Sequence, residues 1–318
     1  MLARTWLAGK LERVAVGKER RTVEIKNLVS IIIPARNEQF LRKTIEDLLI
    51  KAEGEIEIIA VLDGYWPDPI LQDPRVIYIH RGIARGMRAA INSAVAIAKG
   101  KYILKTDAHC MWGPGFDKIL AADCQKDWVA VPTRKRLDAE NWCIQEAGRP
   151  DIEYMFLSYP NDPKDFSGEG LNGKNWDQKN KDEELKKVKI DDLMSAQGSA
   201  WFMRKDYFHK LELMDESQYG KFWNEFQEIG LKCWLSGGRV IVDKNTWYAH
   251  LHKGKKYGRG YTLPEEWLKE GRNHTIKWLK FKKAWDKQTL PLSWLVEHFW
   301  PVPTWTQEGL DKLKATEK

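Results

Sequence analysis

An Asp-x-His pair, Asp107 and His109, directly follows the β-prone run at residues 102–106 (YILKT). If that run is a strand, both side chains leave its carboxyl end, which is the edge where open α/β sheets bind ligands. A carboxylate oxygen together with a neutral imidazole suits Mn²⁺ or a similar divalent ion such as Mg²⁺. Many strands end in Asp and many histidines are merely solvated, so assigning the pair to a metal site depends on the rest of the chain.

Two more acidic side chains follow apolar runs. Glu38 comes after residues 28–34 (LVSIIIP), and Asp63 ends the run at residues 55–62. Several carboxylates at one edge of a parallel sheet are costly unless they meet cations or hydrogen-bond donors. A nucleotide diphosphate with its divalent ion supplies both, and the absence of GxGxxG and GxxxxGK[ST] leaves phosphate neutralisation to metal and basic residues. The alternatives are that Asp63 caps a turn and that Glu38 belongs to a helix N-terminus.

The elements that position these residues alternate between strand and helix from residue 28 to 132, which predicts an α/β fold with a doubly wound, mostly parallel sheet flanked by helices. We expect strands at 28–34, 55–62, 75–80, 102–106, 128–132, 200–203 and 239–242, and helices after residue 40, at 88–99, at 221–235 and around 265–285. Gly100 is predicted to cap the helix at 88–99. The polar stretch at 161–189 predicts a mobile insertion.

Composition indicates a globular protein with an anionic partner. Of the 318 residues, 43% are hydrophobic and 31% are charged, and the formal net charge is +7. That charge favours a nucleotide, a nucleic acid or an anionic surface as partner. The four cysteines form no CxxC pair, which predicts free thiols in a reducing compartment. With neither an apolar run of membrane-spanning length nor a signal-peptide core, we expect a soluble, cytoplasmic protein, whose oligomeric state the sequence leaves open.

The order of the motifs resembles a known family. Residues 30–38 (SIIIPARNE), 62–64 (LDG) and 99–109 (KGKYILKTDAH) resemble the nucleotide-sugar glycosyltransferases of the GT-A fold, which include the family 2 glycosyltransferases. Residues 198–208 (GSAWFMRKDYF), 222–228 (FWNEFQE), 234–238 (WLSGG) and 249–250 (AH) are similar to the polypeptide N-acetylgalactosaminyltransferases. The resemblance covers roughly residues 28–255. It implies a basic N-terminal segment at 1–27, a GT-A domain at 28–255 and a basic, helical, Trp-rich C-terminal extension at 256–318.

The resemblance also implies roles for single residues. Asp107, His109 and His250 would hold Mn²⁺, with His252 as a competing third ligand. Asp63 would contact the nucleoside of a UDP-sugar, and Glu38 would brace the nucleotide site. Gly86 would lie near the donor, and Gly198 would line the sugar pocket.

Glu225 and Glu228 would be the catalytic carboxylates, since their i, i+3 spacing places both on one helical face. Phe222, Trp223 and Asn224 depart from the family pattern before them, so the sugar is not fixed as N-acetylgalactosamine. The closer resemblance implies retention of configuration, while the wider GT-A family uses an acidic residue near Glu225 as an inverting base. Both outcomes stay open.

The sequence therefore predicts a metal-dependent enzyme that moves a hexose or N-acetylhexosamine from a UDP-sugar to a hydroxyl group on a polymer. The basic loop at 253–261 is expected to be a lid whose Lys and Arg meet the donor diphosphate or a basic strip that engages an anionic acceptor, and the alternative is a solvated, flexible loop. In one alternative the acceptor is a hydroxymethylpyrimidine base in DNA, as for some bacteriophage enzymes, because the basic run at 277–287 interleaves with Trp278, Phe281 and Trp285. A second alternative is a non-catalytic nucleotide-sugar or nucleic-acid binding module.

Overall fold

The computed structural model describes residues 24–67, 69–146, 150–160 and 171–318. Residues 1–23 of the expected N-terminal segment and residues 161–170 of the expected insertion lie outside the described residues.

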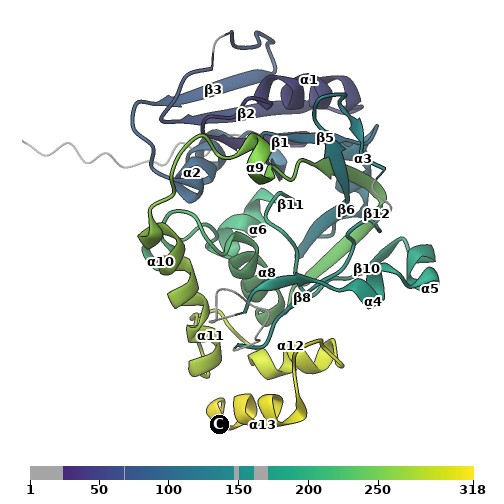
Figure 1. Ribbon diagram of the computed structural model, residues 1–318, viewed down its shortest axis with the longest axis vertical. Helices are drawn as coiled ribbons and strands as arrows, with labels where there is room; N and C mark the ends of the chain where they lie inside the picture. Colours follow the sequence, from purple (N-terminus) through teal and green to yellow (C-terminus); the bar gives the residue numbers. More distant parts are fainter. Residues whose placement is uncertain (1–23, 68, 147–149, 161–170) are drawn as a thin grey trace, which may run out of the picture.

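A mixed, curled sheet forms the centre of the described chain (Figure 1). Its main path has the strand order β10-β12-β6-β11-β4-β1-β2-β3, and the short strands β5 and β7 pair with β12 and β6. The bounds in this spatial order are β10 (Ile190–Asp192), β12 (Arg239–His250), β6 (Trp128–Asp138), β11 (Ala200–Arg204), β4 (Gly100–Thr106), β1 (Ile25–Ala35), β2 (Ile56–Asp63) and β3 (Val76–Arg81), with β5 (Cys110–Trp112) and β7 (Cys143–Ile144).

The expected α/β class is confirmed, and the sheet contains two parallel blocks. Strands β3, β2, β1 and β4 are parallel neighbours, and so are β6 and β12. Between the blocks, β11 runs antiparallel to both β4 and β6. Strand β12 continues to His250, well past the expected end at residue 242, after a register shift between Asp243 and Trp247.

Helices cover both faces of the sheet because alternate residues of a strand point to opposite sides. On one face, Ile31 and Ile33 of β1 pack with α1 (Leu41–Lys51) and α3 (Phe116–Asp123). On the other, Ile32 packs in the cluster that includes α2 (Met87–Ile97), α6 (Lys205–Lys210) and α8 (Glu225–Leu235). This burial on both faces explains why β1 and β2 are almost continuously apolar.

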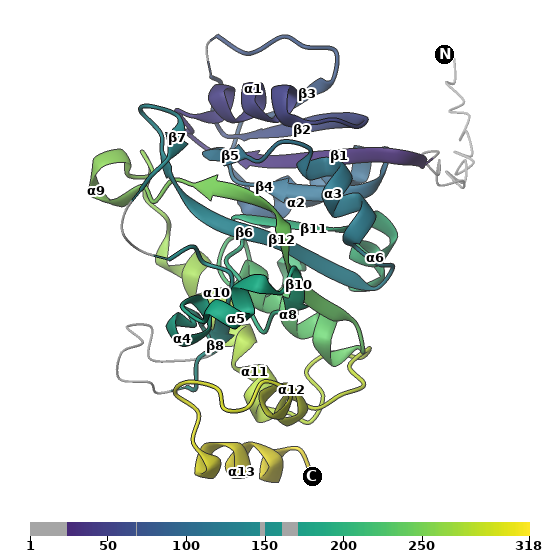
Figure 2. The ribbon, with the colours of Figure 1, turned by 90° about the vertical axis from the view of Figure 1, so that its right-hand side faces the viewer.

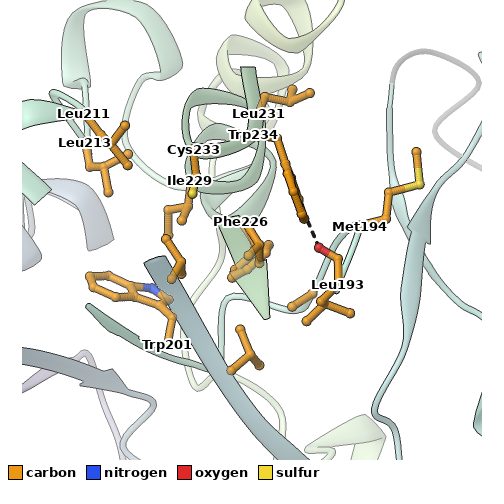
Figure 3. Close-up of a cluster of buried hydrophobic side chains, with 14 of the residues drawn as sticks. Leu193, Met194, Trp201, Leu211, Leu213, Phe226, Ile229, Leu231, Cys233 and Trp234 are labelled. Atoms are coloured by element: carbon orange, nitrogen blue, oxygen red, sulfur yellow. Dashed lines mark hydrogen bonds between the residues drawn. The ribbon is translucent and has the colours of Figure 1, made fainter. Parts of the chain in front are cut away.

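The C-terminal segment packs on the second face through aromatic side chains. It contains α10 (Glu265–Thr275), α11 (Lys277–Lys280), α12 (Leu292–His298) and α13 (Gln307–Thr316), and α12 and α13 lie at the end of the molecule farthest from α1 (Figures 1 and 2). Trp278 is 1% exposed, and its indole donates to the Tyr219 hydroxyl of α7 (Glu216–Tyr219) over 2.9 Å. In the cluster of Figure 3, Trp234 of α8 donates to the Leu193 carbonyl over 3.0 Å.

Three local expectations are corrected. Gly100 begins β4 instead of capping a helix, and a Cβ there would lie 2.5 Å from the Leu28 carbonyl oxygen, so glycine permits the close approach of β1. The helix expected from residue 221 begins at Glu225, because Asn224 adopts φ 58° at its N-cap. The described part of the expected mobile insertion forms β9 (Gly173–Asn175), which pairs with β8 (Met155–Leu157), and two short helices, α4 (Asp177–Asn180) and α5 (Glu183–Lys187).

None of the helices in the described ranges has both the length and the apolar character needed to cross a bilayer.

Candidate active site

A cavity of about 880 Å³ opens at the carboxyl ends of β1, β2 and β4, beside the end of β12. The structure brings most of the predicted site residues to its wall. Those that line it are Glu38, Asp63, Gly86, Asp107, His109, Gly198, Glu225, His250 and His252. Glu228 is not among the lining residues.

Three of these side chains converge on one point. The Nε2 atoms of His109 and His250 are 3.1 Å apart, and Oδ2 of Asp107 lies 3.3 Å from the His250 Nε2 and 3.8 Å from the His109 Nε2. Strand pairing explains the convergence, because Cys110 of β5 lies opposite His250 of β12 and so ties the segment after β4 to the later strand. His252 is two residues beyond His250, outside this group of three.

The residues fit a divalent cation. Ligands bound about 2.1 Å from a common ion lie about 3.0 to 3.5 Å from each other, and two of the three separations fall in or near that range. One carboxylate and two imidazoles form a donor set that borderline divalent ions accept. We therefore take Asp107, His109 and His250 as a candidate metal centre.

Glu38 contacts His109 of this group through the ring nitrogen that faces away from His250. Its carboxylate lies 3.1 Å from Nδ1 of His109 and accepts from Lys253 Nζ over 2.6 Å. A carboxylate on Nδ1 fixes the tautomer that leaves Nε2 free to bind a metal. The structure thus places Glu38 against an imidazole of the candidate metal centre and against the loop that follows β12.

Lys105 is a central site residue that sequence reasoning missed. It is 1% exposed, donates to Asp107 Oδ1 over 2.7 Å, lies 3.3 Å from the Glu225 carboxylate, and donates to the Gly198 carbonyl. The available signal was its position in β4 two residues before Asp107, since residues i and i+2 share one face of a strand. Lys105 therefore joins the metal group to the start of α8.

Glu225 reaches the cavity, and Gly198 makes room for it. The carboxylate also accepts from the Trp201 indole over 2.7 Å. A Cβ at residue 198 would lie 2.6 Å from Glu225 Oε2, so any larger residue would displace the carboxylate. Glycine at 198 leaves the space that the Glu225 carboxylate occupies.

Glu228 occupies a different environment from Glu225. It is 0% exposed and lies in a buried ion-pair group with Arg88 of α2 and Lys232 of α8, the latter at 2.9 Å. Arg88 also donates to the Trp223 carbonyl over 2.7 Å, just before Glu225. The structure does not bring Glu228 to the cavity with Glu225; it links α8 to α2.

Asp63 organises the loop before α2. Its carboxylate accepts the backbone N–H groups of Arg85 and Gly86 over 2.9 and 2.8 Å and pairs with Arg81 at 3.3 Å. Gly86 has φ 100°, and a Cβ there would lie 2.7 Å from the Lys221 carbonyl oxygen. These contacts fix the cavity wall at the carboxyl end of β2.

The loop after β12 forms part of the cavity wall. It includes the short helix α9 (Gly254–Tyr257), where an irregular loop was expected. The Arg36 guanidinium lies 4.1 Å from the centre of the Tyr261 ring, and the Asn37 amide donates to the Gly260 carbonyl over 3.0 Å. These contacts hold the basic loop beside the strand end that carries Glu38.

Electrostatics match the ionisation states that such a site needs. Burial lowers the pKa of His250 to about 3, so its imidazole is neutral at pH 7. Burial alone would raise the pKa of Asp107, but the Lys105 ammonium and the two imidazoles lower it well below its usual range. Burial raises the pKa of Glu225, although Lys105 opposes that shift.

Comparison with known proteins gives consistent matches. The family model described as Glycosyl transferase family 2 matches residues 30–212. WcaA of Escherichia coli K12, whose name assigns it glycosyl transfer in colanic acid biosynthesis, is 33% identical over 107 residues, which are 31% of this chain and 38% of that protein. WfaP of Escherichia coli, named a UDP-Glc:alpha-D-GlcNAc-diphosphoundecaprenol beta-1,3-glucosyltransferase, is 36% identical over 91 residues, 27% of this chain and 36% of that protein. The matches thus span well under half of each relative.

The fold also matches a solved structure. The crystal structure of GalNAc-T7 with UDP, GalNAc and Mn²⁺ superposes with a TM-score of 0.62 at 16% identity, covering 91% of this chain and 55% of that one. At this identity the similarity establishes the GT-A fold.

Proposed function

Because the chain belongs to glycosyl transferase family 2, we propose that it transfers a hexose or N-acetylhexosamine from a UDP-sugar to a hydroxyl group of a polymeric glycan acceptor. The observation that carries this proposal is the convergence of Asp107, His109 and His250 in a cavity at the carboxyl edge of the sheet. A divalent ion such as Mn²⁺ held there would stabilise the negative charge of the departing diphosphate.

The names of two similar proteins support the donor and the ion. GalNAc-T7 was crystallised with UDP and Mn²⁺, and the name of WfaP gives UDP-Glc as its donor. Both Escherichia coli names concern glycan assembly, which supports a glycan acceptor. A DNA acceptor gains no such support; within the basic run Trp278 is buried in the core, while Phe281 is exposed.

The residues on the rest of the cavity wall would bind the substrates and accept a proton. We assign Asp63 and Gly86 to the nucleoside side, because they form the wall at β2. Lys253 and Arg259 of the loop after β12 line the cavity and would contact the phosphates.

We assign Glu225 to the transferred sugar and the acceptor hydroxyl. Burial raises the pKa of Glu225, which brings the carboxylate closer to a proton acceptor matched to neutral pH. Proton removal by Glu225 would accompany inversion at the anomeric carbon, whereas a hydrogen bond that Glu225 accepts from a sugar hydroxyl is compatible with retention. Analysis of the product anomer by NMR separates the two.

The proposal is tested by measuring UDP release from a panel of UDP-sugars, with Mn²⁺ or with EDTA, in the presence of glycan acceptors. We expect release with Mn²⁺ and none with EDTA, and a fall of at least about 10²-fold for Asp107→Asn. His250→Asn and His252→Asn form a matched pair, of which only the first should weaken Mn²⁺ binding measured by calorimetry. Full turnover of Asp107→Asn in EDTA would refute the metal assignment, and nucleotide binding without release would favour the binding module.

A further inference from the structure

Two arginines line the cavity on the part of the wall formed by β6. Arg134 and Arg136 are two residues apart, so both side chains leave the same face of the strand. The residue between them, Lys135, leaves the opposite face and pairs with Asp151 at 2.6 Å. The local sequence thus directs two guanidinium groups into the cavity.

These arginines lie beside the candidate metal centre, on a strand several positions away from the strand that carries Asp63. Arg136 is the cross-strand neighbour of His250, and Arg134 is that of Tyr248. Strand β6 is separated from β2, which carries Asp63, by β1, β4 and β11.

The positive charge of the pair is not balanced within the described residues. Arg134 is 6% exposed, and among the described residues its side chain donates only to the Asn175 amide oxygen, over 3.5 Å. Arg136 has a buried Nε atom without a hydrogen-bond partner. No ion pair to either arginine occurs in the ranges that the structure describes.

The carboxylates of the cavity are committed to other partners. Glu38 pairs with Lys253, Asp63 with Arg81, and both Asp107 and Glu225 with Lys105. A buried guanidinium without a counter-charge is costly, and a ligand oxyanion would remove that cost. The planar fork of arginine matches carboxylate and phosphate oxygens in particular.

We propose that Arg134 and Arg136 bind an oxyanion, a carboxylate or phosphate, carried by the acceptor, so that the enzyme selects an anionic acceptor. This inference rests on the proposed transfer reaction, because it takes the nucleoside to lie at Asp63 and the diphosphate at the metal centre. The wall at β6 then faces the space left for the acceptor, and the two guanidinium groups hold the acceptor charge beside the reacting hydroxyl.

The test measures anion binding with the donor site filled. Full-length protein is saturated with UDP and Mg²⁺ and titrated with inorganic sulfate or methyl glucuronide, with methyl glucoside as the neutral probe, by isothermal titration calorimetry. We expect both anions to bind and methyl glucoside to bind at least about tenfold more weakly. Arg136→Gln and the double variant Arg134→Gln/Arg136→Gln should lose about tenfold or more in anion affinity, while Lys135→Gln, the matched control on the other face, should bind as the wild type does.

Several results would overturn the inference. One is the absence of anion binding to the wild type, and another is unchanged binding by the variants. Competition between sulfate and UDP, with an equal loss of UDP affinity in Arg136→Gln, would assign the arginines to the donor diphosphate instead. Thermal melting shows whether each variant is folded. If replacing the more buried Arg134 unfolds the protein, Arg136→Gln alone tests the proposal. If UDP itself fails to bind, the proposed function fails, while anion titration without UDP still decides whether the arginines form a subsite.

Discussion

Gly198→Ala should disable the enzyme through a single methyl group. The backbone of Gly198 is not in the left-handed region, so alanine introduces no backbone strain there. Its Cβ would nevertheless lie 2.6 Å from Oε2 and 2.8 Å from Cδ of Glu225. Since ordinary contacts begin near 3.4 Å, the carboxylate must retreat by about 0.8 Å. That movement removes Glu225 from Lys105 and from the Trp201 indole, which it now contacts at 3.3 and 2.7 Å.

A displacement of this size from a productive geometry costs about 10²-fold in turnover, or about 2.7 kcal/mol of barrier. The assay is UDP release under saturating donor and metal, with UDP affinity measured by calorimetry. We expect kcat to fall about 10²-fold while UDP affinity changes little, because Gly198 lies on the Glu225 side of the cavity.

Gly230→Ala is the matched control. Gly230 lies in the same helix as Glu225, and the nearest atom to its added Cβ would be 3.7 Å away. This variant should keep the wild-type kcat and gain up to about 1 kcal/mol of stability from helix propensity. Wild-type turnover by Gly198→Ala, with the protein folded, would refute the assignment of Glu225 to the reacting centre.

Three more predictions concern buried charges. Lys105→Met leaves Asp107 without its cation, so the free energy of unfolding, measured in urea without metal, should fall by about 3–5 kcal/mol. Added Mn²⁺ should restore part of that stability. An unchanged urea midpoint would contradict this prediction. Asp243 is 0% exposed, and burial raises its pKa to about 6, so the folded state binds more protons than the unfolded state between about pH 4 and 6. Wild-type stability should therefore fall as pH rises through that window, and Asp243→Asn should flatten the curve in denaturation at several pH values. Glu228→Gln leaves Arg88 unpaired and should lower the free energy of unfolding by about 3–5 kcal/mol, while kcat stays within about tenfold of the wild type. A hundredfold fall in kcat would show that Glu228 takes part in catalysis.

The sequence predicted those parts of the fold that depend on local pattern. Strands β1 and β2 contain nearly continuous apolar runs because helices cover both faces, and that pattern is readable without a structure. The antiparallel insertion of β11 between β4 and β6 was not predicted, because it depends on pairing between segments far apart in the chain. The extension of β12 to His250 was missed for the same reason.

The candidate site divides in a similar way. Asp107 and His109 are one local pair, and their position at a strand end follows from the sequence alone. His250 entered only through family resemblance, because nothing local ties it to a residue 141 positions away. The i, i+3 spacing placed Glu225 and Glu228 on one helical face, but it could not reveal that Arg88 holds Glu228 in the core. Long-range charge pairing decides which of the two carboxylates meets the cavity.

The pairing of β12 with β5 also bears on the order in which the protein matures. His109 lies within the first half of the chain and His250 lies beyond residue 212, where the family match ends. Bringing His109 and His250 together closes a long loop of the chain. The entropy cost of that closure is offset by strand pairing in the completed sheet. A nascent chain whose synthesis has not reached β12 therefore contains two of the three candidate metal ligands and lacks His250. Under the proposed function, donor and cation would be bound only after synthesis has passed His250, and a chain that ends earlier would not transfer sugar.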